Sequence, residues 1–182
     1  MHQLGRMWLA VILTWWIAAP ASADVRIVEL LPDPPNDIAG DANHDGNRSA
    51  IEDEFVELLN TGNAPMDLSN WTLSDAAKVR HTFPAGTTLA PRETLVVFGG
   101  GQPQGIKGHV FTAVAGTLSL NNNGDVVTLR DSAMEIMDSI SYDSAGQRDQ
   151  SLVRNGDGEL VLHTSLEGAQ DALYSPGVVI TQ

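Results

Sequence analysis

The feature that most limits the fold of this chain is the division of everything after Asp24 into short apolar runs separated by turn residues. No segment keeps a helical period over three turns. Clusters of Gly, Asn, Asp and Pro, as at residues 60–63 and 155–158, separate the runs. The expected strands lie at residues 25–31, 54–60, 66–74, 94–100, 109–114, 125–131, 135–143 and 159–165. Many short strands at this spacing predict an all-β antiparallel sandwich or barrel, with Trp71 as a core residue.

Composition narrows the possible partners. The 182 residues carry a formal net charge of −13, so the chain would repel nucleic acid and anionic membranes, and it suits cations better. It has no cysteine, which excludes disulfides, thiolate zinc sites and Cys nucleophiles. We therefore expect no nucleic acid among its partners.

Residues 1–23 have the pattern of a signal peptide. Arg6 precedes an apolar run at residues 7–19, and the stretch ends in Ala21-Ser22-Ala23, which has the A-x-A pattern of a signal-peptidase cleavage site. The alternative is an uncleaved anchor, although the run is short for a membrane span. We predict a mature domain at residues 24–182, secreted or periplasmic (extracytoplasmic), with no membrane association after cleavage.

A calcium-binding sequence motif lies before the second expected strand. The stretch DANHDGNRSAIE, residues 41–52, fits D-x-[DN]-x-[DN]-G-x5-E in full, with Gly46 at the turn. Calcium takes six to eight oxygen ligands, which alternating short acidic and amide side chains supply. The predicted ligands of Ca²⁺, within an insert at about residues 33–53, are Asp41, Asn43, Asp45, the backbone carbonyl of Asn47, Ser49 and a bidentate Glu52.

Two features of this loop depart from an EF-hand. Arg48 follows the seventh place, and an expected strand follows the loop where an EF-hand has a helix. Asp53 or Glu54 could join or replace Glu52 as a ligand. A plain solvated acidic turn is the alternative, because Asp, Asn and Gly are also ordinary turn residues.

The chain resembles a bacterial lamin tail domain over nearly all of its mature length. The resemblance lies in VRIVELLPDPP, then DEFVELLNTGNAPMDLSNWTLSD, TFPAGTTLAPRETLVVF, SLNNNGDVVTLRD and the closing QSLVRNGDGELVLHTS and YSPG. It implies an immunoglobulin-like antiparallel β-sandwich without catalytic residues. In lamins such a domain is a structural and interaction module, and in exported bacterial proteins it resembles an accessory unit of hydrolases or nucleases.

The residues themselves also favour a non-catalytic protein. The histidines after Asp24 are scattered, without H-E-x-x-H spacing, and no G-x-S-x-G elbow occurs. The glycine-rich stretch 99–108 lacks the Lys-Ser/Thr ending of a phosphate loop. We expect a calcium-stabilised structural or interaction module with an unknown protein or surface polymer as partner. The alternatives are a surface glycan- or protein-binding module, an accessory subunit of an exported nuclease or hydrolase, and a metal-dependent hydrolase, which would need an open coordination position.

Overall fold

The computed structural model describes residues 24–180. The predicted signal peptide lies outside these residues. Within them, no helix is long and apolar enough to cross a membrane. The regular elements are short strands and 3₁₀ turns: β1 (Val25–Leu31), η1 (Asp37–Gly40), β2 (Phe55–Asn60), β3 (Met66–Asp67), β4 (Thr72–Ser74), β5 (Val79–Thr82), β6 (Thr88–Leu89), β7 (Thr94–Phe98), β8 (His109–Thr112), β9 (Asp125–Arg130), β10 (Ile136–Tyr142), η2 (Ser144–Gln147), β11 (Leu152–Arg154), β12 (Leu160–Leu162), η3 (His163–Ser165) and η4 (Glu167–Ala169).

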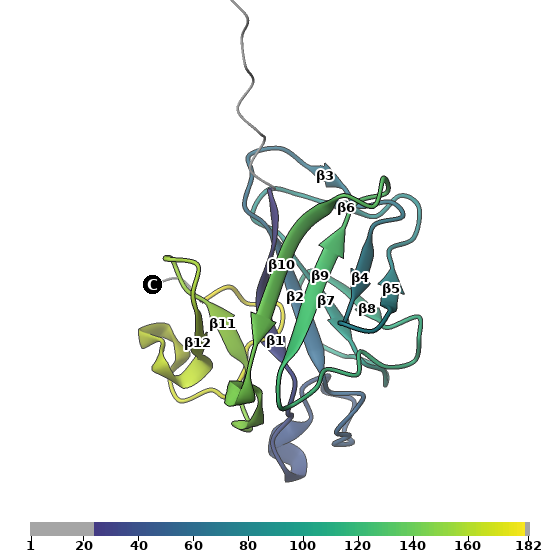
Figure 1. Cartoon of the computed structure of the whole chain (residues 1–182). Coiled ribbons are helices and arrows are strands. Elements are labelled where there is room, and N and C mark those ends of the chain that lie inside the picture. Colours follow the sequence, from purple (N-terminus) through teal and green to yellow (C-terminus); the bar gives the residue numbers. More distant parts are fainter. Residues whose placement is uncertain (1–23, 181–182) are drawn as a thin grey trace, which may run out of the picture.

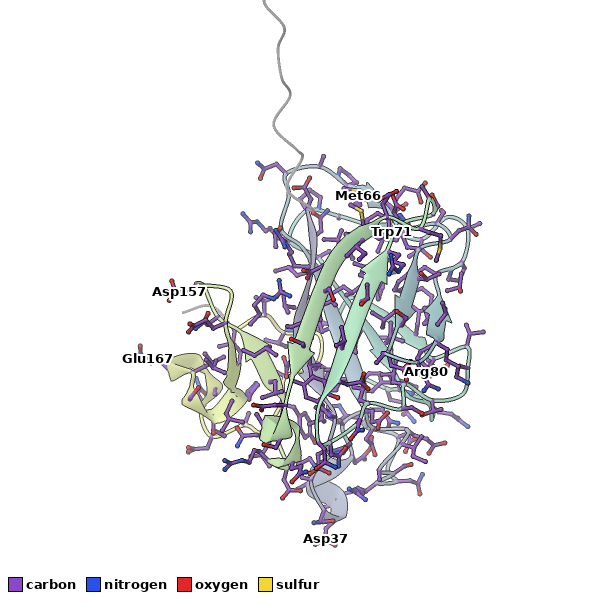
Figure 2. All side chains as sticks on the ribbon, viewed as in Figure 1. Asp37, Met66, Trp71, Arg80, Asp157 and Glu167 are labelled. Atoms are coloured by element: carbon purple, nitrogen blue, oxygen red, sulfur yellow. The ribbon has the colours of Figure 1, made fainter. Side chains whose placement is uncertain are left out.

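The strands form two packed sheets (Figure 1). The larger has the order β12-β11-β1-β2-β7-β8, and the smaller has the order β10-β9-β4-β5. The short β3–β6 ribbon lies at one end of the sandwich, and Figure 2 shows Asp37 of η1 at the opposite end from Met66 and Trp71. The prediction of an all-β, immunoglobulin-like sandwich is confirmed.

The main core fills the space between the two sheets. Alternate residues of the paired strands point into it, as the two-residue period of a strand requires. Trp71 lies in this core with 6% of its surface exposed, as predicted. The largest fully buried side chains of this core include Ile27, Leu30, Leu58, Leu68, Leu73, Phe83, Leu89, Leu95 and Leu118.

The outer face of the larger sheet is covered as well. Leu31, Phe55, Val96 and Phe98 form a second buried cluster there, with the rings of Phe55 and Phe98 5.6 Å apart. Ala42 of the acidic loop belongs to this cluster, and Ile106 and Tyr174 pack against it. Strands β2 and β7 are therefore buried on both faces, which agrees with the almost wholly apolar sequence of β7.

The structure corrects some of the predicted strands. The run 66–74 is divided into β3 and β4, because a turn with Asn70 at φ +61° separates them. Strand β8 pairs with β7 in parallel rather than antiparallel. Strands β5, β6 and β11 were missed. Strands β9 and β10 pair antiparallel as a hairpin, and β11 and β12 pair around the turn residues at 155–158.

Asp138 of β10 ties the two sheets together. Its Oδ2 accepts the backbone N–H of Ile27 at 2.8 Å, at the point where the β1–β2 register shifts. Arg154 of β11 donates through Nη1 to Oδ1 at 3.2 Å and has its Nη2 3.1 Å from Oδ2, and Arg26 of β1 lies 3.4 Å from Oδ1. Asp138, which is 6% exposed, therefore binds the irregular point of β1 and the arginines of two strands of the facing sheet.

We expect Asp138→Ala to lower the free energy of unfolding by about 3–5 kcal/mol, because it leaves a largely buried guanidinium without its carboxylate partner. Urea unfolding followed by the fluorescence of Trp71 measures the change in the mature chain. Glu135→Ala, an exposed acid before the same strand, is the matched control and should change stability by about 0.5 kcal/mol or less. Equal stabilities of the two variants would show that Asp138 does not hold the sheets together.

Candidate metal-binding loop

The acidic loop between η1 and β2 folds as a chain of side-chain-to-backbone turns. Asp41 accepts the N–H of Asp45 through Oδ1 at 3.1 Å and the N–H of Gly46 through Oδ2 at 3.0 Å. Asn43 Oδ1 also accepts from Asp45, at 2.9 Å, and Asp45 Oδ1 accepts from Asn47, at 2.9 Å. Gly46 has φ +91°, where a side chain would be strained. The first, third and fifth predicted ligands are thus gathered over three successive N–H groups.

The next two predicted ligands are placed less closely around this turn. Asn47 is exposed, and its side-chain amide donates to Asp45 Oδ1 at 3.4 Å. Ser49 Oγ accepts the N–H groups of Ile51 and Glu52, at 3.4 and 3.2 Å. The hydroxyl of Ser49 therefore closes the turn that leads into β2.

Of the two neighbouring acids at the end of the loop, Asp53 faces the turn. Asp53 is fully buried, and its carboxylate accepts the N–H of Asn43 at 3.0 Å and the N–H of Ser49 at 2.6 Å. Glu52 is exposed, and its side chain lies along Gly100 instead, where a Cβ would stand 3.0 Å from Glu52 Cγ. Among the described residues, the Glu52 carboxylate accepts none of the hydrogen bonds that shape the turn.

The acidic loop concentrates negative charge that no ion pair among the described residues compensates. Burial raises the pKa of Asp53, and the charge of Asp41 adds to the rise. Hydrogen bonds, first from the N–H of Gln102 and then from that of Asn47, lower the pKa of Asp45. Arg48 donates to the carbonyls of Pro34 and Pro35. Across residues 24–180, no ion pair reaches Asp41, Asp45, Glu52 or Asp53.

A glycine-rich loop after β7 wraps the acidic loop, a contact that the sequence did not predict. Gln102 N–H donates to Asp45 Oδ2 at 3.1 Å, and Gln104 N–H donates to the carbonyl of Asn43 at 2.9 Å. A Cβ on Gly99 would lie 1.9 Å from the carbonyl oxygen of Ile51, and one on Gly101 would lie 2.3 Å from Asn43 Nδ2. The run of three glycines directly after a buried strand was the available signal, since glycine allows two backbones to approach closely.

The donors in this loop suit a hard cation only as a mixed set. Among the described residues, no group of three or more His, Asp or Glu side chains is arranged to hold a metal ion. A cation here would therefore depend on amide and backbone oxygens in addition to the carboxylates. Such a set of carboxylate, amide and carbonyl oxygens is the one that calcium accepts in proteins.

Comparison with known proteins supports the assignment of the fold. A sequence model of the lamin tail domain matches residues 18–144, more than two thirds of the chain. No curated protein matches the chain significantly. Strands β11 and β12 and the segment that follows them lie beyond the matched residues. Lamin tail domains are non-catalytic structural and interaction modules with an immunoglobulin-like fold. On the extent of this match and on its sandwich fold, the chain belongs to the lamin tail domain family.

Proposed function

We propose that this protein is an exported, non-catalytic interaction module whose acidic loop binds Ca²⁺. The proposed ligands are Asp41, Asn43, Asp45, the backbone carbonyl of Asn47, and Asp53 in place of Glu52. The proposal of export is supported by the signal-peptide pattern of residues 1–23. The proposal of an interaction role is supported by the family to which the chain belongs.

The observation that carries the calcium proposal is a pair of buried, uncompensated carboxylates. Asp41 is 9% exposed and Asp53 is fully buried, and each raises the energy of the other when both are charged. Hydrogen bonds from backbone N–H groups stabilise the two carboxylates in part. Each carboxylate oxygen keeps a second lone pair for a cation. The alternative is that Asp53 serves only as an acceptor for these N–H groups, with no ion.

The effect of the ion would be structural. Asp53 directly precedes Glu54 and β2, and the glycine-rich loop after β7 is bonded to the same turn. A cation held there would join the acidic loop, this second loop and the start of β2 at one end of the sandwich. Loops at the end of a rigid sandwich are suited to recognition, and we propose that a protein or surface polymer is recognised at this end.

Calcium should raise the thermal stability of the mature chain. Binding to the folded state alone contributes about 2.7 kcal/mol at a hundredfold excess over Kd, which corresponds to a rise in Tm of roughly 5–10 °C for a domain of this size. We expect a Kd of roughly 0.1–1 mM, as in extracellular modules. Differential scanning calorimetry measures the shift with Ca²⁺ at about a hundredfold excess over Kd (about 10–100 mM for this Kd), with Mg²⁺ at the same ionic strength, and with a chelator. Identical Tm values in Ca²⁺ and chelator would leave Asp53 as a hydrogen-bond acceptor only.

Variants of the acids should identify the ligands. Asp45→Asn and Asp53→Asn are each expected to weaken calcium binding by about tenfold or more, because each removes a charged ligand. Glu52→Gln should change the affinity by about twofold or less, since its side chain lies along Gly100. Isothermal titration calorimetry gives the affinities. Asp131→Asn is the matched control, because Asp131 is also an acid that accepts two backbone N–H groups in a turn. Loss of binding in Glu52→Gln alone would return Glu52 to the ligand set.

A further inference from the structure

Two glutamates lie opposite each other on the outer face of the larger sheet. Glu29 of β1 and Glu57 of β2 are register partners in the antiparallel pair. Their neighbours Leu30, Val56 and Leu58 point into the core between the sheets, so both glutamates point to the other face. They are 3% and 1% exposed. Directly opposite like charges destabilise a strand pair, and burial increases that cost.

The C-terminal strap, residues 170–180, is docked on these two carboxyl groups. Glu29 accepts the N–H of Ser175 through Oε1 at 2.9 Å and its hydroxyl through Oε2 at 2.7 Å. Glu57 Oε2 accepts the N–H of Gly177 at 2.8 Å. Ser151 Oγ donates to Glu29 at 2.6 Å. The other oxygen of Glu57, Oε1, is buried without a hydrogen-bond partner among the described residues.

Few other ionisable groups face the pair. His163 of η3 is fully buried, and its Nε2 lies 3.9 Å from Glu29 Oε1. Its Nδ1 is 2.8 Å from the carbonyl of Ala172 and therefore carries a proton. Arg26 and Arg154 line the cavity of about 340 Å³ that adjoins the glutamates, and both are bound to Asp138.

Beyond the glutamates the strap has further polar and apolar contacts. The N–H of Ser151 donates to the carbonyl of Leu173 at 2.8 Å. Ile180 packs against the small cluster of Val153, Leu166 and Ala169. The hydroxyl of Tyr174 donates to the carbonyl of Ala39 at 2.8 Å. The two glutamates thus provide the hydrogen bonds that hold Ser175 and Gly177 to the sheet.

We propose that Glu29 and Glu57 form a proton-dependent latch, which keeps the strap docked while the pair carries at most one negative charge and releases it when both groups are ionised. One negative charge is tolerable in this position, because the hydroxyl groups of Ser151 and Ser175 donate hydrogen bonds to Glu29. A second charge, on Glu57, would have one N–H donor on a side chain that is almost fully buried. Movement of the strap away from the sheet admits water to both groups.

The direction of the pH dependence follows from the geometry, because burial favours the neutral form of both carboxyl groups. Burial, and next the charge of Glu29, raise the pKa of Glu57 to about 8. Burial also raises the pKa of Glu29, against the hydrogen bonds of Ser151 and Ser175. The folded-state pKa of Glu57 lies above its ordinary value of 4.5. The stabilisation is therefore complete below about pH 4.5 and is lost as pH rises through about 8.

Methyl NMR of the mature chain tests the latch in the presence of a chelator, so that the acidic loop is not a variable. The probes are the contacts of the Ile180 methyl groups with those of Val153 and Leu166. In the wild type we expect these contacts at pH 6.5 and their loss at pH 9.5, where the ionised fraction of Glu57 exceeds the neutral fraction by about tenfold or more. Contacts between Leu58 and Leu95, which are register partners in the core, should remain at both pH values.

The matched variants separate the latch from general alkaline unfolding. Glu57→Gln keeps an acceptor for Gly177 and removes the charge, so its strap contacts should remain at pH 9.5. Glu135→Gln, on the surface, should behave as the wild type. Wild-type strap contacts that remain at pH 9.5 would overturn the proposal, as would equal loss in Glu57→Gln. If Glu57→Gln does not fold, the wild type alone still tests the latch. Loss of the strap contacts and the core contacts together at pH 9.5 would indicate general unfolding and would also overturn the proposal.

Discussion

The burial of β2 on both faces is the constraint on which the rest of the structure depends. One face packs into the core between the sheets through Val56 and Leu58, and the other packs under the loops and the strap through Phe55. A strand in this position has no solvated side on which to place charge. Yet the segment from Asp53 to Glu57 contains three acids, and all three are buried. The acidic loop, the glycine-rich loop and the C-terminal strap are all arranged around those acids.

Three buried carboxyl groups of this protein are stabilised in three different ways. Asp138 has arginine partners across the sandwich. Asp53 has backbone N–H donors, to which the proposed calcium ion would add a charge. Glu57 has one N–H donor, and burial favours its protonated form. These arrangements differ in what disturbs them, because an arginine pair is nearly independent of pH and of divalent cations between pH 6 and 9, whereas the other two are not.

The sequence predicted the long strands well because their apolar period and their turn residues agree. It missed β5, whose sequence VRHT has an exposed Val and two buried basic residues, Arg80 and His81. It also missed the two-residue β6 and the three-residue β11, which are too short to show a period. The parallel placement of β8 depends on the course of residues 99–108 across the sheet edge, which no local pattern encodes.

For the acidic loop, spacing predicted which residues gather around the turn but not which of the two adjacent acids faces it. Asp41, Asn43 and Asp45 are brought together as the alternation requires. Whether Glu52 or Asp53 faces them depends on the turn that Ser49 Oγ closes, and adjacent acids cannot be distinguished by spacing alone. The contacts of Gln102 and Gln104 join segments more than fifty residues apart, so they became visible only in the folded chain.

The position of β11 has a consequence for where this domain can end. The match to the family stops at residue 144, and β11 pairs with β1 through only Glu29↔Val153 and Leu30↔Leu152. A polypeptide that stopped at the family boundary would leave strand β1 as an open edge. It would also lack Ser151 and Ser175, which donate to Glu29, and Gly177, which donates to Glu57. Open edges recruit strands from other molecules. In this protein β11 covers that edge, and the outermost strand of the sheet is the three-residue β12.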